Sequence, residues 1–414
     1  MTLDAVHFEA MTDLINRVNR PGRARDRRAL AERLWEEGLI DPPHKVPLEP
    51  IDTPKRHAMS IESLAVRDGE FERITAIDAG SLNPTTFQNG LVVDVAHAAV
   101  ASTPSDIDLH RQRTIVAAVH GPPAEVRSTD EWIEFDHGYG RARLLAAPSL
   151  KHEEETAVHG LSLAAAEVSH ALSFGVEHGD LLLMDGSVYP ASILHWADRE
   201  GTLAQRLHVD PEPRAVLEDA IALIDRCRER STPIVGVVKN WTARGIVRGL
   251  NEADDLEVGT VPWPTDASLF QQLLANIADE RTELRWTSWF AMTATVGTGL
   301  GYVIEEYDLA ASEAASAYDL AMMVVYDPRE NLVFRIEAPR FLIEEDSTRE
   351  QITWHILSGI AREGGPPPTL RKADELARIG RGERRILKRE LASALTSTEV
   401  PRYDDIRWGS VEAD

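Results

Sequence analysis

Two short apolar stretches of the sequence each run into an aspartate that is soon followed by glycine and serine. Ile74 to Ile77 leads into Asp78, and Leu181 to Met184 leads into Asp185. A short apolar run that ends at turn-forming residues is typical of a buried strand, and open α/β sheets carry their sites at the carboxyl ends of such strands. If the two strands are neighbours, their carboxylates repel each other, and a divalent cation relieves that repulsion. The alternative is that each aspartate only caps a turn.

Two further charged residues could take part in the same chemistry. Glu167 interrupts a mostly apolar part of a predicted helix, residues 161–168, where burying a carboxylate without a partner is unfavourable. Lys239 ends the apolar run from Pro233 to Val238, so it would reach the same sheet edge and suit a phosphate oxygen. The simpler alternatives are a solvent-facing helix glutamate and a lysine that extends from its strand into water.

The elements that would position these residues alternate between strand and helix. Three successive strands are predicted near residues 74–77, 90–100 and 114–119, and a long helix over residues 153–177 leads into the Asp185 strand. Other predicted helices cover residues 212–230, 349–362, 370–379 and 383–395, and other predicted strands lie near residues 285–290, 302–306, 320–326 and 332–336. This order predicts an α/β fold. His97, within the second strand, is interpreted as structural, as most single histidines in apolar strands are.

The composition is that of a globular protein with an acid-rich surface. The chain has 414 residues, 43% hydrophobic content and a formal net charge of -24, and only six of its 44 basic residues are lysines. We interpret this acidic, lysine-poor surface as adaptation to high salt, which screens charge repulsion to within a few ångströms. A nucleic-acid site would therefore be a local basic patch or a cation-bridged contact.

The cysteine content and the absence of long apolar runs bear on the cellular compartment. Cys227 is the only cysteine, which excludes an intrachain disulfide and a zinc site made of cysteines. No apolar signal core and no apolar run of membrane-spanning length occurs. We therefore expect a soluble, cytoplasmic protein with no membrane association.

The order of the candidate acids (strand, helix, strand, late helix) is that of ribonuclease H-like nucleases, and the surrounding residues resemble the NurA nuclease family. The resemblance covers about Phe71 to Ile379. It departs from the family at two positions: Ala79 is inserted between Asp78 and Gly-Ser, and Asp374 stands where the family often has histidine. His355 is the fallback for that fourth role. The matching stretches, in order, are Ile77-Asp78-Ala79-Gly80-Ser81, Glu167, Leu183-Met184-Asp185-Gly186-Ser187, Ile234 to Lys239, Phe334 to Pro339 and Gly365 to Ile379.

The resemblance implies a fold, an activity and a partner. It implies a ribonuclease H-like mixed sheet flanked by helices, with a helical arm and proline-rich linker over residues 1–54 and a NurA-type nuclease domain over residues 55–414. It implies a manganese- or magnesium-dependent DNA nuclease, a 5′-to-3′ exonuclease and single-strand endonuclease, that works beside a HerA-type hexameric translocase in DNA end resection and repair. The metal ligands would be Asp78, Glu167, Asp185 and Asp374, and Lys239 would neutralise charge on the scissile phosphate.

Two other functions fit part of the pattern. Asp78-Ala79-Gly80-Ser81 also looks like the first phosphate loop of actin-like and sugar-kinase ATPases. That class needs a second glycine-rich turn, whereas Asp185-Gly186-Ser187 supplies only one glycine. An inactive adaptor of a translocase would keep the fold and lose the acids, so the four candidate acids favour a nuclease.

The two ends of the chain carry its main concentrations of basic residues. Several arginines occur in the helical arm predicted over residues 4–38, which is broken at Pro21-Gly22, and Arg384, Arg385, Lys388 and Arg389 occur in the last predicted helix. These clusters could contact either DNA or an acidic partner surface. We expect them to serve assembly, in a homodimer and in docking to a HerA-like ring, because amphipathic arms have an apolar face to bury.

Overall fold

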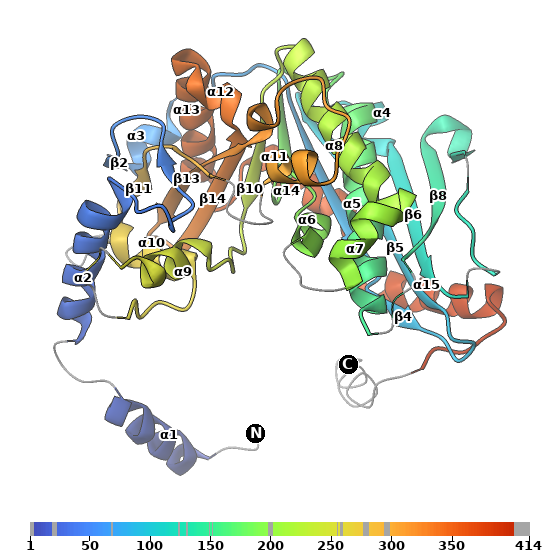
Figure 1. Cartoon of the computed structure of the whole chain (residues 1–414), viewed down its shortest axis with the longest axis horizontal. Helices are drawn as coiled ribbons and strands as arrows, with labels where there is room; N and C mark the ends of the chain where they lie inside the picture. The colour runs from blue at the N-terminus through green and yellow to red at the C-terminus, as the bar shows by residue number, and fades with distance from the viewer. Residues whose placement is uncertain are drawn as a thin grey trace.

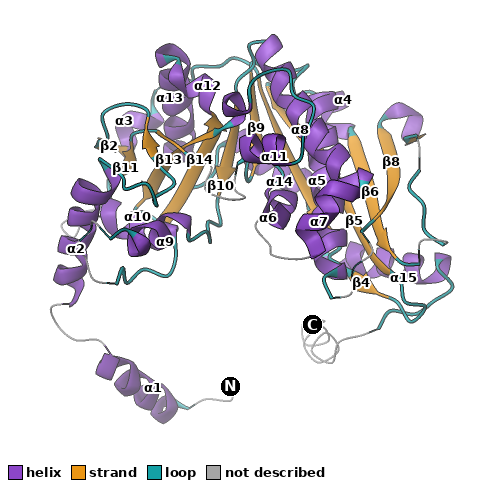
Figure 2. Cartoon of the chain, in the orientation of Figure 1, coloured by secondary structure: helices purple, strands orange, loops and turns teal. Residues whose placement is uncertain are grey.

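A computed structural model of the chain describes residues 4–400, except 19–22, 68, 123–124, 130, 149, 151, 198–201, 255, 257–259, 276–280 and 294–298. One large mixed sheet runs through the molecule, and helices cover both of its faces (Figure 1). Figure 2 shows the same arrangement by element type, with the strands enclosed between layers of helix. The predicted α/β class, a mixed sheet flanked by helices, is therefore confirmed.

Within the described residues, fourteen strands form this sheet, in the order β1-β12-β13-β14-β10-β9-β3-β5-β6-β8-β7, with β2, β4 and β11 paired off this path. At its centre β3, β5 and β6 form an antiparallel meander, and β9 and then β10 run parallel to β3. This central order, β6-β5-β3-β9-β10, is that of a ribonuclease H-like core. The strands are β1 (Glu49–Pro50), β2 (Arg56–Ser60), β3 (Ile74–Ser81), β4 (Thr85–Thr86), β5 (Val92–Thr103), β6 (Arg113–His120), β7 (Ile133–Phe135), β8 (Gly140–Ala146), β9 (Leu181–Asp185), β10 (Ile234–Val238), β11 (Glu283–Thr287), β12 (Phe290–Ala291), β13 (Leu320–Asp327) and β14 (Leu332–Pro339).

The described helices lie in the connections between these strands, before β1 and after β14. Among the described helices, none combines the length and the apolar character needed to cross a bilayer. They are α1 (Ala5–Val18), α2 (Arg23–Arg33), α3 (Ile61–Ala65), α4 (Ile107–Arg111), α5 (Glu154–His170), α6 (Ala191–Ala197), α7 (Thr202–Val209), α8 (Pro211–Glu229), α9 (Gly245–Glu252), α10 (Asp266–Leu274), α11 (Leu300–Glu306), α12 (Arg340–Glu344), α13 (Asp346–Glu363), α14 (Pro368–Ala377) and α15 (Arg381–Ala394), with π-helical turns η1 (Leu34–Leu39) and η3 (Ala171–Gly175) and 3-10 turns η2 (Asp136–Gly138) and η4 (Ala315–Tyr318).

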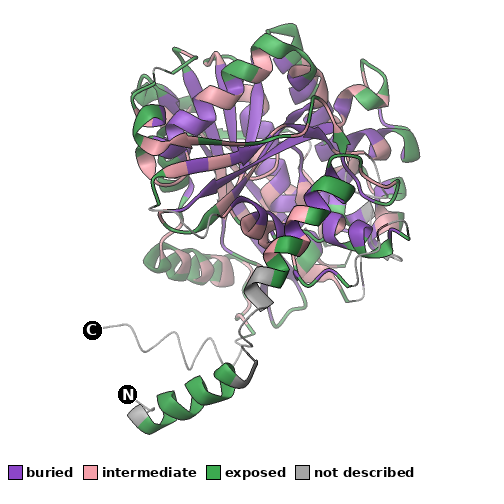
Figure 3. Ribbon diagram, turned by 90° about the vertical axis from the view of Figure 1, so that its left-hand side faces the viewer, coloured by how far each residue is buried: buried purple, intermediate pink, exposed green. Residues whose placement is uncertain are grey.

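The central strands are buried because they are apolar on both faces. In β9, Leu182 and Met184 belong to the hydrophobic cluster that includes α5 and α8, whereas Leu181 and Leu183 belong to the cluster that includes α13 and α14. Successive side chains of a strand point to opposite faces, so the two clusters lie on opposite sides of the sheet. Figure 3 shows these strands buried within the body of the molecule.

Strand β3 is longer than the sequence predicts. We expected a strand near residues 74–77 followed by a Gly-Ser turn, but β3 continues through Ser81 and pairs with β5 residue by residue, with Gly80 opposite His97. The inserted Ala79 is part of this extended strand. Gly80 is required by packing, because a Cβ atom there would lie 2.2 Å from the carbonyl oxygen of Ala377 at the end of α14.

The strand predicted near residues 302–306 is wrong. These residues form α11, and its buried side chains Leu300, Val303 and Ile304 recur at the spacing of one helix face. An apolar run this short does not by itself distinguish a strand from a helix.

The predicted arm and linker, residues 1–54, divide into two parts in the structure. Helix α1 stands apart from the body (Figure 1), and its apolar side chains from Val6 to Ile15 are exposed. Residues from Ala31 onward pack into the body, where the rings of Trp35 and Phe290 meet edge to face at 6.1 Å. The predicted break at Pro21-Gly22 lies outside the described residues.

Candidate metal centre

Asp78 and Asp185 lie side by side where β9 ends. Ile77 pairs with Met184 in the parallel register of β3 and β9, so the next residue of each strand is an aspartate. Side chains alternate between the two faces of a strand, and by this alternation both aspartates point to the face of the sheet that α14 covers. Asp374 extends from α14 on that face. One carboxylate oxygen from each of the three residues lies within 4.8 Å of the other two.

Lys239 supplies a positive charge beside this group. It follows β10, the parallel neighbour of β9, and its Nζ atom lies 2.5 Å from Oδ2 of Asp185. The Asp185 side chain is only 7% exposed, so this ion pair is largely shielded from water. One lysine partly balances Asp185 and leaves the other carboxylates in excess.

Glu167 approaches the group from the opposite face of the sheet, on α5. It is half-buried, and its pKa is raised well above the usual range of a glutamate, first by burial and then by the negative charges of Asp78 and Asp185. The structure therefore places all four acids expected from the sequence in one electrostatic neighbourhood, with Glu167 outside the closest group of three.

The charge of the site is poorly balanced. Burial and the neighbouring charge of Asp185 raise the pKa of Asp78 to about 7, although the backbone N–H of Ala79 donates to Asp78 and opposes that rise. Burial also raises the pKa of Asp185, against the lowering effect of Lys239. Asp78 and Asp185, whose ionisation burial opposes, lie beside the exposed Asp374, and such a group of carboxylate oxygens fits a hard divalent cation.

The histidines considered as ligands or structural residues lie elsewhere. His355 packs against Phe71 at a ring distance of 5.4 Å, and burial lowers its pKa to about 4. His97 has a lowered pKa, mainly through burial, and hydrogen-bonds to the backbone of Ala377. Among the described residues, the candidate metal ligands gather only at Asp78, Asp185 and Asp374.

Glu337 is a residue whose role the sequence did not indicate. It is fully buried in β14, and its Oε2 accepts hydrogen bonds from Ser187 Oγ at 2.6 Å and from the backbone N–H of Val188 at 3.2 Å. Arg335 forms an ion pair with it. Glu337 thus fixes the turn that follows Asp185, and the available signal was an acid inside a strand whose only other charged residue is Arg335.

The phosphate-loop alternative does not fit this geometry. Asp78 to Ser81 form an extended strand paired with β5, whereas a phosphate loop wraps its backbone N–H groups around the anion.

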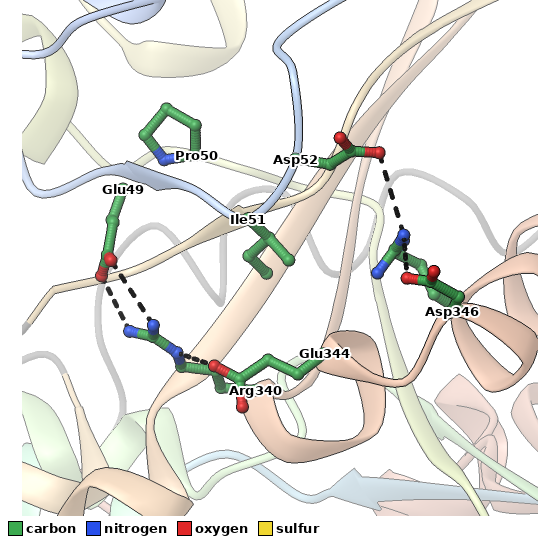
Figure 4. Close-up of a pocket in the computed structure, with 8 residues that line it drawn as sticks. Glu49, Pro50, Ile51, Asp52, Arg340, Glu344 and Asp346 are labelled. Atoms are coloured by element: carbon green, nitrogen blue, oxygen red, sulfur yellow. Dashed lines mark hydrogen bonds and ion pairs between the residues drawn. The ribbon is translucent and has the colours of Figure 1, made fainter.

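A separate pocket of about 320 Å³ lies between β1 with the residues that follow it and helices α12 and α13. Figure 4 shows its side chains. Arg340 pairs with Glu49 at 2.8 Å and with Glu344 at 2.7 Å. Arg349 pairs with Asp346 at 2.7 Å and lies 3.8 Å from Asp52. Each of these four carboxylates has an arginine partner and is at least 50% exposed, so arginine and water together stabilise its charge.

Clustered carboxylates at the strand ends of a mixed sheet are an arrangement that suits a divalent metal ion. The family model described as NurA domain matches residues 72–379, which is most of the chain. The chain therefore belongs to the NurA family.

Solved structures and curated proteins were also compared with the chain. The NurA nuclease from Sulfolobus solfataricus is 13% identical, with 95% of this chain and 98% of that chain covered and a TM-score of 0.49. NurA bound to dAMP and manganese is 11% identical, with the same shares covered and a TM-score of 0.44. NurA with manganese is 11% identical, with 80% of this chain and 90% of that chain covered and a TM-score of 0.44. No curated protein matches the chain.

Proposed function

We propose that this chain hydrolyses DNA with a divalent cation, manganese or magnesium, held by Asp78, Glu167, Asp185 and Asp374. The observation that carries the proposal is the group of three carboxylates within 4.8 Å of one another, faced by Lys239, in a chain of the NurA family. Carboxylate oxygens are the ligands that hard divalent ions prefer.

Each residue has a role that follows from its place. Bound ions would activate a water molecule and stabilise the leaving oxygen. Asp185 lies between Asp78 and Lys239 in the strand order and would share the ions, while Asp78 and Glu167 hold one and Asp374 completes the other. Lys239 then neutralises charge on the scissile phosphate, because Asp185 no longer needs it as its counter-charge.

The test of this proposal is DNA cleavage with and without metal. We expect cleavage in manganese, none in excess chelator, and a loss of at least about a hundredfold in Asp185→Asn, which removes one formal charge at nearly constant shape. The matched control is Asp346→Asn in the pocket of Figure 4, where the aspartate is 89% exposed and cleavage should persist. Chelator-resistant cleavage would contradict the proposal, and ATP hydrolysis abolished by Asp78→Asn would favour the ATPase.

The finer activity and setting follow from family membership and are proposals of the same kind. The protein acts as a 5′-to-3′ exonuclease and single-strand endonuclease in DNA end resection and repair, in the cytoplasm, beside a HerA-type translocase. The acid-rich, lysine-poor composition supports function at high salt.

Assembly, as a homodimer and with the translocase, is proposed to involve α1. Phe8, Met11 and Ile15 recur at helical spacing and are 53%, 50% and 65% exposed, so α1 offers an apolar stripe to a partner. Deleting residues 1–18 removes this stripe and leaves intact the segment from Ala31 that packs into the body. We expect the deletion to reduce the mass in solution or translocase binding while cleavage persists. A deletion that lowers only DNA affinity would show that the arm contacts DNA.

A further inference from the structure

Helix α5 is buried along most of its length apart from one line of side chains. Between residues 157 and 170, only His159, Leu163 and Glu167 are not buried. They are spaced four residues apart, so they lie on one side of the helix in successive turns. Because Glu167 belongs to the proposed metal centre, this line of partly buried side chains leads along α5 from the centre to His159.

His159 is held in place by a buried carboxylate. Its Nδ1 lies 2.8 Å from Oδ2 of Asp94 in β5, and Ser162 Oγ donates to the same oxygen at 3.1 Å. The Asp94 side chain has no exposed surface, whereas that of His159 is 41% exposed. A buried carboxylate is costly without compensation, and His159 is its one ionisable partner among the described contacts. The proposed metal centre does not use this pair.

The pair leaves one ring nitrogen for a ligand. With Nδ1 directed at Asp94, Nε2 lies on the far side of the ring from that carboxylate. When both ring nitrogens of a histidine carry hydrogen, Nε2 donates an N–H to an anion, for which a phosphate oxygen is a strong acceptor. A metal ion at Nε2 would need further ligands, and among the described residues no second group of candidate ligands is present.

The distance between His159 and the metal centre follows from β3 and α5, which run side by side in opposite directions. His159 Nδ1 lies 3.4 Å from Ser81 Oγ at the end of β3, and Thr75 Oγ1 near its start donates to the carbonyl of Gly175 just beyond α5. Ser81 is three residues after Asp78, about 10 Å along a strand. His159 is eight residues before Glu167, about 12 Å along a helix. The path along β3 and the path along α5 therefore give a similar separation between His159 and the metal centre.

We propose that His159, oriented by Asp94, binds a backbone phosphate of the DNA strand a few nucleotides from the scissile phosphate. This inference rests on the proposed nuclease function and adds a phosphate-binding subsite to it. The subsite places the strand on the side of α5 that carries Glu167, Leu163 and His159.

The test compares an oligodeoxynucleotide with bis(4-nitrophenyl) phosphate, a small phosphodiester that reaches only the metal centre. In His159→Gln we expect kcat/KM for the oligonucleotide to fall about tenfold, the effect of losing one charge-assisted hydrogen bond. The loss should lie mainly in KM, and the small substrate should be affected much less. Asp94→Asn should act in the same direction, and His159→Lys should restore part of the loss. His178→Gln, an exposed histidine in the turn after η3, is the matched control.

A binding measurement in chelator gives a second readout that does not depend on cleavage. In fluorescence anisotropy, the loss of one phosphate contact should reduce the slope of log affinity against log salt by about 0.7 to 0.9. An equal loss on both substrates, or an oligonucleotide KM and salt slope unchanged from the wild type, overturns the inference. If the wild type cleaves neither substrate with metal, the nuclease proposal fails, and the anisotropy still decides whether His159 contacts DNA.

Discussion

Two acid-rich groups in this protein use the same kind of side chain in opposite ways. At the metal centre, three carboxylates lie within 4.8 Å of one another and face one lysine. In the pocket of Figure 4, two arginines pair with four carboxylates that are between 50% and 89% exposed. Each group has two more carboxylates than cationic side chains, so net charge does not distinguish them. The comparison teaches that burial, here of Asp78 and Asp185, marks the place where a cation is needed, rather than a count of acids or a cavity volume.

The substitution Asp78→Asn is expected to have the largest effect, and it tests whether the metal centre differs from the pocket of Figure 4 by binding a cation. In chelator at pH 8, above the pKa of about 7, the substitution removes a partly buried charge and its repulsion, so we expect the free energy of unfolding to rise by about 1 kcal/mol. Manganese at a hundred times its Kd should stabilise the wild type by about 2.7 kcal/mol and the variant much less. Urea unfolding with and without manganese measures both effects. Equal manganese stabilisation in the two proteins would place the ion elsewhere.

A comparison of two variants tests whether Asp374 or His355 is the fourth metal ligand. Asp374→Asn should weaken manganese stabilisation, and His355→Leu should preserve it, because His355 packs against Phe71 in the core. Loss of manganese stabilisation in His355→Leu and its retention in Asp374→Asn would reverse this assignment.

His355→Leu should also make folding less sensitive to acid. The pKa of this buried histidine is lowered from 6.5 to about 4, so the unfolded chain binds its proton more readily than the folded chain. Its stabilising contribution is complete above pH 6.5 and is lost as the pH falls towards 4, by about 3 kcal/mol in all. Unfolding free energies at pH 7.5 and 4.5 should therefore differ by less in the variant. An equal difference in both proteins would show that His355 does not cause the acid loss.

The smallest effect is expected in the exposed pocket of Figure 4. Glu344→Gln breaks an ion pair with Arg340 that is half exposed, and exposed ion pairs contribute little, so the free energy of unfolding should change by less than about 1 kcal/mol. Cleavage should remain at the wild-type rate. If Glu344→Gln impaired cleavage as strongly as Asp185→Asn, the distinction between the two acid-rich groups would be lost.

The sequence predicts the central fold better than the details of the site. Strand alternation and apolar runs locate β3, β9 and β10, and with them the places of Asp78, Asp185 and Lys239, because short buried strands leave a local signal. The contribution of Asp374 depends on how α14 docks against β3, which leaves no local signal. Glu337 leaves a local signal as an acid within a strand, but its contact with the turn after Asp185 depends on the pairing between β14 and β10. The roles of these residues as ligands stay predictions until metal binding is measured.

The docking of α14 on β3 has a consequence for how the protein is made. Gly80 lets the end of α14 approach β3, and this contact helps to bring Asp374 to Asp78 and Asp185. Synthesis proceeds from the amino terminus, so the meander and β9 leave the ribosome long before α14 does. A growing chain therefore holds Asp78 and Asp185 without Asp374 until α14 has been synthesised.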